Sequence, residues 1–200
     1  MNSTIIGPDG EPRCSWCAAA PEFVAYHDSE WGFPVFDDRR LFEKLCLEGF
    51  QSGLSWRTIL VKRENFRAAF HDFDFNRVAR FGQRDVQRLL RDAGIVRHRG
   101  KIEAVINNAQ RAQELVKTEG SLAAFVWRYQ PRLEELEKPQ TASTSDASIA
   151  LSAALKQRGW KFVGPTTVYA FMQAMGLIND HAEGCVIRAK VERATKKMAR

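Results

Sequence analysis

Apolar side chains recur along this chain of 200 residues with the spacing of an α-helix, and this periodicity constrains the fold more than any other feature. The clearest case follows Lys101, where one helical face carries Ile102, Val105, Ile106 and Ala109. The alternation of apolar and polar residues that marks a half-buried strand is nearly absent, and no repeat occurs at solenoid periods. The sequence therefore predicts an all-α fold.

Helix-starting and helix-ending residues divide this pattern into segments. The expected helices cover residues 37 or 38 to 49, 58–70, 78–81, 85–92, 101–116, 121–129, 145–158 and 166–175. The first begins at an acidic cap, Asp37 or Asp38, and Gly49 is a suitable end. Residues 130–145 contain two prolines and several Ser and Thr, which predicts the longest loop. The length fits one domain, or one domain with a lobe.

Composition excludes several classes of protein. Hydrophobic residues make up 44% of the chain, too many for an intrinsically disordered protein. No apolar run approaches the roughly 20 residues that span a bilayer, and the first residues lack the pattern of a signal peptide. Four cysteines are too few for a disulfide scaffold in a chain of this length. We therefore expect a cytoplasmic globular protein with no membrane partner.

The charge balance is basic, with 30 Lys and Arg against 24 Asp and Glu and a net charge of +6. A charge of this size fits either a nucleic-acid-binding surface or an ordinary solvated surface. Basic residues cluster at 97–101 and again in the tail, 188–200. The tail is only weakly apolar, so we expect it to be frayed rather than part of a shaped site.

Two pairs of Cys and His residues have spacings that suit a metal ion. Twelve residues separate Cys14 from His27, while His181 and Cys185 stand at i and i+4, on one side of a helix or turn. Together they make the Cys₂His₂ set of a closed, tetrahedral structural zinc site. The alternatives are ordinary buried side chains, or a role for Cys17, which forms a C-x-x-C with Cys14. A thioredoxin-like role is disfavoured because no βαβ pattern follows.

A carboxylate stands in an apolar helical stripe. Counted at 100° per residue from Leu41, Leu45 lies at about 40° and Glu48 at about −20°. A buried carboxylate must be paired, neutralised or exposed to a cavity, because burying it alone costs several kcal/mol. Functional acids are often placed in this way. The alternative is that Glu48, in the last turn before Gly49, lies at a solvated rim.

Aromatic residues are concentrated near this acid. The first 56 residues contain Trp16, Phe23, Tyr26, Trp31, Phe33, Phe36, Phe42, Phe50 and Trp56. Most aromatic residues at such spacing belong to a core. An acid among Trp and Tyr side chains is also what a pocket for a flat cationic ring requires, since the rings provide stacking faces and the acid provides a balancing charge.

Residues 89–102 pair two short helical patterns across a connection that contains Gly94 and Gly100. A hairpin between helices presents backbone N–H groups that bind phosphate without reading base sequence, and flanking Arg and Lys residues add charge. The segment is similar to a helix-hairpin-helix element but lacks the usual L-P-G-V-G hairpin. A plain helical turn with a solvated basic loop is the alternative.

Taken together, these features resemble the 3-methyladenine DNA glycosylase I family of bacterial alkylation-repair enzymes. The resemblance runs in order from about Arg13 to Cys185. Its most specific segments are YHDSEWG at 26–32 and EGFQSGLSW at 48–56. Further segments are CSW at 14–16, KREN at 62–65, DAGIVRHRGKI at 92–102, KFVG at 161–164 and FMQAMGLINDH at 171–181.

The resemblance implies a role for each matching residue. It implies structural Zn²⁺ on Cys14, His27, His181 and Cys185. It implies that Glu48 is the catalytic, base-binding acid, in a pocket whose aromatic members are Trp16, Phe23, Tyr26 and Trp56. Phe23 stands where a Tyr is common, so stacking is kept there without a hydroxyl contact. The implied DNA contacts are Gly53, Leu54 as a wedge, Gly94, Arg97, Arg99, Gly100 and Lys101.

The implied domain layout has a disordered extension at 1–12, a single glycosylase domain at 13–187 and the basic tail at 188–200. The helix-hairpin-helix element falls at about 85–109. The zinc site joins the N- and C-terminal segments in a lobe formed by 13–35 and 145–187.

The implied reaction is excision of 3-methyladenine from alkylated double-stranded DNA by a monomeric enzyme. The methylated base already carries a positive charge and leaves readily, so extrusion and recognition of the base are the difficult steps. The helix after the hairpin offers Glu103 rather than the usual Asp, and no Lys is placed as an amine nucleophile. We therefore expect release of free 3-methyladenine without strand cleavage. The alternative is a zinc-stapled protein that binds alkylated bases without excising them.

Overall fold

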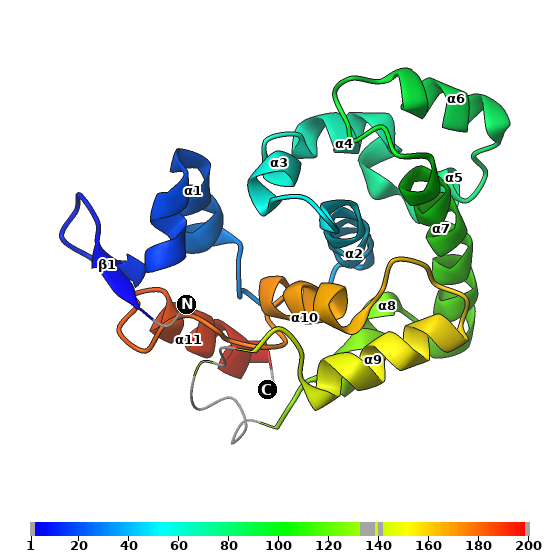
Figure 1. The fold of residues 1–200 in the computed structure, drawn as a ribbon. Coiled ribbons are helices and arrows are strands. Elements are labelled where there is room, and N and C mark those ends of the chain that lie inside the picture. Colours follow the sequence, from blue (N-terminus) through cyan, green and yellow to red (C-terminus); the bar gives the residue numbers. More distant parts are fainter. Residues whose placement is uncertain (1–2, 133–138, 140–141, 199–200) are drawn as a thin grey trace.

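The computed structural model describes residues 3–132, 139 and 142–198 (Figure 1). Its elements are the strands β1 (Thr4–Ile6) and β2 (Pro12–Cys14), the 3₁₀ helices η1 (Ser15–Ala19), η2 (His71–Phe73) and η3 (Trp127–Tyr129), and the helices α1 (Pro21–Ser29), α2 (Asp38–Gln51), α3 (Trp56–Leu60), α4 (Arg63–Ala69), α5 (Phe75–Val78), α6 (Gln83–Arg91), α7 (Arg99–Glu119), α8 (Leu122–Val126), α9 (Asp146–Gln157), α10 (Pro165–Ala174) and α11 (Arg188–Met198). The predicted helical architecture is confirmed, apart from one short hairpin.

Helix α2 is the central element of the fold. The Asp37 side chain caps it by accepting a hydrogen bond from the Arg40 backbone N–H, as the sequence predicts. Every residue from 41 to 50 is buried, and α2 packs against α7, α8 and α10 (Figure 1). The helix continues through Gly49, where a Cβ would lie 3.3 Å from the Cβ of Phe162. Glycine is therefore needed there for close packing and not as the predicted helix end.

Within the described part of the chain, the buried apolar side chains form two cores. The larger contains α2, α7, α9 and α10 and a row of phenylalanines that includes Phe42, Phe50, Phe66 and Phe70. The smaller consists of Cys14, Ala182, Cys185, Ile187 and Val191. It joins the first and last parts of the described chain, which lie together on one side of α10 (Figure 1). Across the described ranges, no helix combines the length and apolar character that a membrane span requires.

The segment predicted as one helix from 58 to 70 is two. The Ser55 side chain accepts a hydrogen bond from the Thr58 backbone N–H and begins α3, which ends at Leu60. A new helix, α4, then begins at Arg63. Periodicity alone did not reveal this break because apolar residues continue on both sides of it.

The structure corrects the prediction of a disordered extension at 1–12. Among residues 3–12, β1 pairs with β2 in antiparallel register, with Thr4 opposite Cys14 and Ile6 opposite Pro12. The Arg13 guanidinium holds the hairpin by ion pairs with Asp9, at 2.7 Å, and with Asp28, at 2.9 Å. Strands of three residues are too short to show an alternating pattern, which is why the sequence does not reveal them.

The prediction of a frayed tail at 188–200 is also wrong for its described part, 188–198, which is helix α11. Val191 is fully buried in the smaller core. The Arg188 side chain donates hydrogen bonds to the carbonyl oxygens of Asn179, at 3.0 Å, and His181, at 2.7 Å. These contacts attach the start of α11 to the loop before it, so tertiary packing stabilises a segment whose own apolar pattern is weak.

Candidate active site

A pocket of about 510 Å³ lies between α1, α2, α3 and α10. Its lining residues are Trp16, Ala19, Phe23, Tyr26, Trp31, Glu48, Gln51, Trp56, Ala142, Ser143, Thr166, Tyr169, Ala170, Gln173 and Asp180. All five predicted base-binding residues are among them. The lining therefore combines aromatic faces with two carboxylates, Glu48 and Asp180.

The aromatic rings meet edge to face around the pocket. Trp16 lies 5.8 Å from Phe23, 6.4 Å from Tyr26 and 5.1 Å from Trp31, measured between ring centroids. On the other side, Tyr26 and Trp56 are 5.4 Å apart and tilted by 43°. Trp31 appears among the aromatic residues of the sequence, but its place in the pocket was not predicted. Edge-to-face contacts of this kind fix ring orientation and leave ring faces available for stacking.

Glu48 is buried, with 6% of its surface exposed, as its place in the apolar stripe predicts. Its Oε1 lies 2.7 Å from the Nζ of Lys44, one helical turn earlier. The same Nζ donates a hydrogen bond to the Tyr26 hydroxyl at 2.8 Å and lies 3.4 Å from the ring centroid of Trp56. Lys44 was missed by the sequence analysis, although the i, i+4 spacing from Glu48 was a usable signal.

Burial alters the acid–base properties of this group of side chains. Desolvation lowers the pKa of Lys44, and the adjacent Glu48 carboxylate partly opposes that shift. Burial and the charge of Glu48 raise the pKa of Tyr26 well above its ordinary value of 10. The Tyr26 hydroxyl therefore stays protonated at neutral pH.

The second carboxylate, Asp180, is held by α10. Its Oδ2 accepts hydrogen bonds from the Tyr169 hydroxyl, at 2.6 Å, and from the Gln173 side-chain amide, at 2.8 Å. Burial and this hydrogen bond raise the pKa of Tyr169. Sequence reasoning missed all three residues. The i, i+4 spacing of Tyr169 and Gln173, and the position of Asp180 next to His181, were the available signals.

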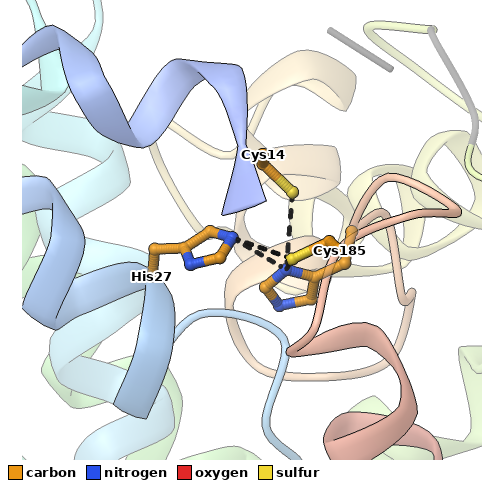
Figure 2. A group of neighbouring side chains, drawn as sticks. Cys14, His27 and Cys185 are labelled. Atoms are coloured by element: carbon orange, nitrogen blue, oxygen red, sulfur yellow. Dashed lines mark hydrogen bonds between the residues drawn. The ribbon is translucent and has the colours of Figure 1, made fainter. Parts of the chain in front are cut away.

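The four predicted metal ligands come together beside the pocket. Their ligand atoms all lie within 4.8 Å of one another, and all four side chains are buried. The His181 Nδ1 is 3.1 Å from the His27 Nε2, and the Cys185 Sγ is 3.5 Å from the same His27 atom. In Figure 2 the side chains of Cys14, His27 and Cys185 point toward one another from β2, from α1 and from the loop before α11.

The remaining nitrogen of each histidine is held by another group. His27 Nδ1 lies 2.7 Å from Asp28 Oδ1, and His181 Nε2 lies 2.9 Å from the Trp31 carbonyl oxygen. Such contacts orient a histidine so that its other nitrogen faces a metal. Two sulfurs and two nitrogens directed at one point match the donor set of tetrahedral zinc. Cys17 is outside this cluster, and burial raises the pKa of its thiol.

The cluster also contacts the pocket directly. The Trp16 ring meets the His27 ring edge to face at 5.3 Å, and the Trp31 ring meets the His181 ring in the same way at 4.6 Å. Two pocket aromatics are thus packed on the histidines of the cluster. Loss of the cluster would therefore disturb the pocket wall.

The predicted hairpin joins α6 to α7 through residues 92–98. Arg97 and Arg99 are exposed, as a phosphate contact requires. Gly94 is packed, because a Cβ there would lie 3.1 Å from the Cβ of Asn65. The Lys62 ammonium and the Asn65 amide both donate to the Gly94 carbonyl oxygen, at 3.3 Å.

Other predicted DNA contacts lie near α2 and at the start of α7. Gly53 and Leu54 stand on the exposed turn after α2, where Gly53 has a φ of +79° and Leu54 is 42% exposed. Gly100, in the first turn of α7, is partly buried.

Lys101 requires a correction. It was predicted as a DNA contact, but its side chain is buried. Its Nζ donates hydrogen bonds to the carbonyl oxygens of Phe50, at 2.8 Å, and Ser52, at 2.6 Å. It thus caps the C-terminal end of α2, where unpaired carbonyls favour a cation. The sequence contained a signal, since Lys101 shares a helical face with the buried Val105.

Comparisons with known proteins agree with this geometry. The model of the methyladenine glycosylase family matches residues 16–189. The chain is 51% identical to DNA-3-methyladenine glycosylase 1 of Escherichia coli strain K12, over 86% of this chain and 95% of that protein. A crystal structure of 3-methyladenine DNA glycosylase I superposes with a TM-score of 0.81 at 49% identity, covering 87% of this chain and 98% of the other.

A variant of 3-methyladenine DNA glycosylase I in complex with 3-methyladenine also superposes with a TM-score of 0.81, at 36% identity. That match covers 88% of this chain and 97% of the other. The family match and the similarity in sequence and structure extend over most of the chain, and the family match at 16–189 includes the pocket residues and three of the four members of the Cys/His cluster, His27, His181 and Cys185. The chain therefore belongs to the methyladenine glycosylase family.

Proposed function

We propose that this protein is a DNA-3-methyladenine glycosylase that hydrolyses the N-glycosyl bond of 3-methyladenine in double-stranded DNA and leaves the strand intact. The observation that carries the proposal is the buried Glu48 carboxylate in a pocket walled by Trp16, Tyr26 and Trp56. The names of the similar proteins, and the 3-methyladenine bound in one similar structure, support the choice of base.

Recognition of the base follows from the chemistry of the pocket. Stacking on the indole rings suits a flat purine, and each cation–π contact contributes about 0.5–2 kcal/mol when the base carries charge. The Glu48 carboxylate accepts a hydrogen bond from the base and favours its positive charge. Because the site is partly shielded from water, both interactions are stronger there than on an exposed surface.

The reaction needs little acid catalysis. Methylation at N3 gives the base a positive charge, so the base leaves C1′ with the bonding electron pair, and water supplies the hydroxyl that replaces it. In the helix after the hairpin, Glu103 is partnered by the exposed Arg99 at 3.3 Å and does not line the pocket. Lys44 is held by Glu48, Tyr26 and Trp56 and is not among the pocket-lining residues, so it is not presented to C1′.

Base extrusion is assigned to two surface elements. Leu54, on the exposed turn after α2, enters the space that the flipped base leaves. The connection between α6 and α7, with Arg97 and Arg99, binds the phosphate backbone as a helix-hairpin-helix element. These contacts hold the duplex without reading sequence, while the pocket selects the base.

The Cys/His cluster is proposed to hold structural Zn²⁺. The support is its donor set of two thiol sulfurs and two histidine nitrogens, its burial and the hydrogen bonds that orient both rings. Bound there, zinc supplies four ligand bonds that join segments far apart in the sequence. It has no step in the reaction.

The test is release of free 3-methyladenine from duplex DNA methylated in vitro, followed by chromatography. We expect release together with strands that stay intact until alkali cleaves the abasic sites. Binding of the methylated duplex with no release at high enzyme concentration would instead establish the alternative of a non-catalytic binder. Strand breaks formed by the enzyme without alkali would contradict simple hydrolysis.

A further inference from the structure

We propose that Lys44 is a specificity-determining residue, which weakens the preference of the pocket for a cationic base and lets the pocket accept uncharged purine analogues of the same shape as well. The inference rests on the proposed function, because it takes the pocket to be a purine site. It starts from one observation: the groups suited to recognise a cationic base already contact a cation that belongs to the protein.

The contacts of Lys44 show this directly. Its Nζ lies 2.7 Å from the Glu48 carboxylate, 2.8 Å from the Tyr26 hydroxyl and 3.4 Å from the centroid of the Trp56 ring. Those three partners line the pocket, whereas Lys44 does not. Lys44 is 6% exposed. The ammonium is therefore a fixed charge behind the pocket wall, in contact with the parts of that wall that attract a cation.

A fixed ammonium in this position changes what the pocket attracts. A cation in the cavity is drawn to Glu48 but is repelled by Lys44 just behind it, and the weak dielectric screening of a buried site strengthens both effects. The ammonium also lies over the Trp56 ring, so a cationic base stacked on that ring meets a like charge across it. An uncharged base of the same shape keeps its stacking and hydrogen bonds and avoids both penalties.

Other charges near Lys44 do not restore the preference for a cation. Glu30 and Arg63 also act on Lys44 electrostatically. They form a two-point ion pair with each other, with N–O distances of 2.6 and 2.9 Å. Their effects on a ligand in the pocket therefore largely cancel. Of the two carboxylates that line the pocket, Glu48 contacts Lys44, and Asp180 accepts hydrogen bonds from Tyr169 and Gln173, so Lys44 offsets the attraction of one of the two for a cation.

The experiment compares two ligands of one shape. The permanent cation 3,9-dimethyladeninium and its uncharged 3-deaza analogue, in which carbon replaces N3, are titrated against the full chain by calorimetry. We expect wild-type affinities for the two ligands within about tenfold of each other. Lys44→Met keeps an unbranched side chain, one heavy atom shorter, and removes the charge, and we expect it to raise the ratio of cation to neutral affinity by about tenfold or more.

The matched control is Lys156→Met, the same substitution at an exposed site on α9. It lowers the net charge equally and is expected to leave the affinity ratio unchanged. An unchanged ratio of cation to neutral affinity in Lys44→Met would overturn the inference. A wild-type preference for the cation above about a hundredfold would also overturn it, and that measurement does not depend on whether Lys44→Met folds. Wild-type excision of 3-methyladenine is measured in parallel, so that failure of the proposed function is seen separately.

Discussion

At the scale of single residues, the energetics of the site depend on one buried ion pair. Glu48 and Lys44 are each 6% exposed, and their charged atoms are 2.7 Å apart. Removing two charges from water is costly, and their mutual attraction roughly balances that cost only while both are present. The pair therefore adds little net stability, but loss of either partner leaves an uncompensated charge in the interior.

The first prediction concerns Glu48→Gln, which keeps the shape of the side chain and removes its charge. We expect weaker binding of a cationic base and a loss of about 3 kcal/mol in the free energy of unfolding, because Lys44 is left as an unpaired buried cation. Adding Lys44→Met to this variant should restore much of the stability without restoring binding through the carboxylate. Urea unfolding and ligand titration measure the two effects. Equal stability of the single and double variants would contradict the argument.

At the scale of elements, the spacing of residues along a helix determines which charged side chains share a face. The end of a neighbouring helix can then determine whether a charged side chain is buried. In α2 the i, i+4 spacing directs Lys44 and Glu48 to one face. Lys101, at the start of α7, is buried in this way, because its ammonium donates hydrogen bonds to carbonyl oxygens at the C-terminal end of α2. Arg97 and Arg99, which flank His98 in the sequence, remain exposed, and the His98 Nδ1 accepts a hydrogen bond from the Lys101 backbone N–H.

The second prediction follows for the hairpin. Replacing Arg97 and Arg99 together by Ala should weaken binding to methylated and unmethylated duplexes alike, since phosphate contacts carry no sequence information. The slope of log affinity against log salt should fall by about 1 for each arginine–phosphate interaction that the substitutions remove. Fluorescence anisotropy across a salt series measures both, with the exposed pair Lys117→Ala and Lys156→Ala together as the control that removes the same two charges elsewhere. An unchanged slope would show that this hairpin does not hold DNA.

At the scale of the whole molecule, the Cys/His cluster joins the two ends of the described chain. Cys14 and His181 are 167 residues apart in sequence, yet their side chains meet at 3.6 Å. Among the residues that the structure describes, the smaller core around them contains five buried residues, too few to stabilise a lobe by apolar burial alone. The metal proposed for this cluster would close this long loop and add its binding energy to folding.

The third prediction concerns His181→Ala. We expect loss of bound zinc and a clear drop in melting temperature, because the metal is proposed to connect β2, α1 and the loop before α11. Turnover per folded molecule, measured well below the melting temperature, should change far less than stability does. Asn179→Ala is a nearby control that removes no ligand. Abolished turnover in a variant whose melting temperature is unchanged would assign the metal a role in the reaction.

Much of this molecule follows from local sequence. The periodic spacing of apolar residues predicted most helices, because a helix must bury one face. The place of Glu48 in such a face predicted its burial, and the Cys and His residue types predicted the four members of the cluster. The break between α3 and α4, the hairpin of β1 and β2, and α11 were not predictable in this way, since their patterns are short or weak.

The packing of the helices determines which side chains contact one another around the site. The sequence by itself determined which side chains are available and which helical face each one shares. It did not determine that Lys44 meets Tyr26 and Trp56, that Lys101 turns inward, or that Asp180 is held by Tyr169 and Gln173. These contacts join separate elements, so they depend on how the helices pack. The physical reason is that a charged group is buried only where partners compensate its lost hydration, and apart from the Lys44–Glu48 contact within α2 those partners come from other elements.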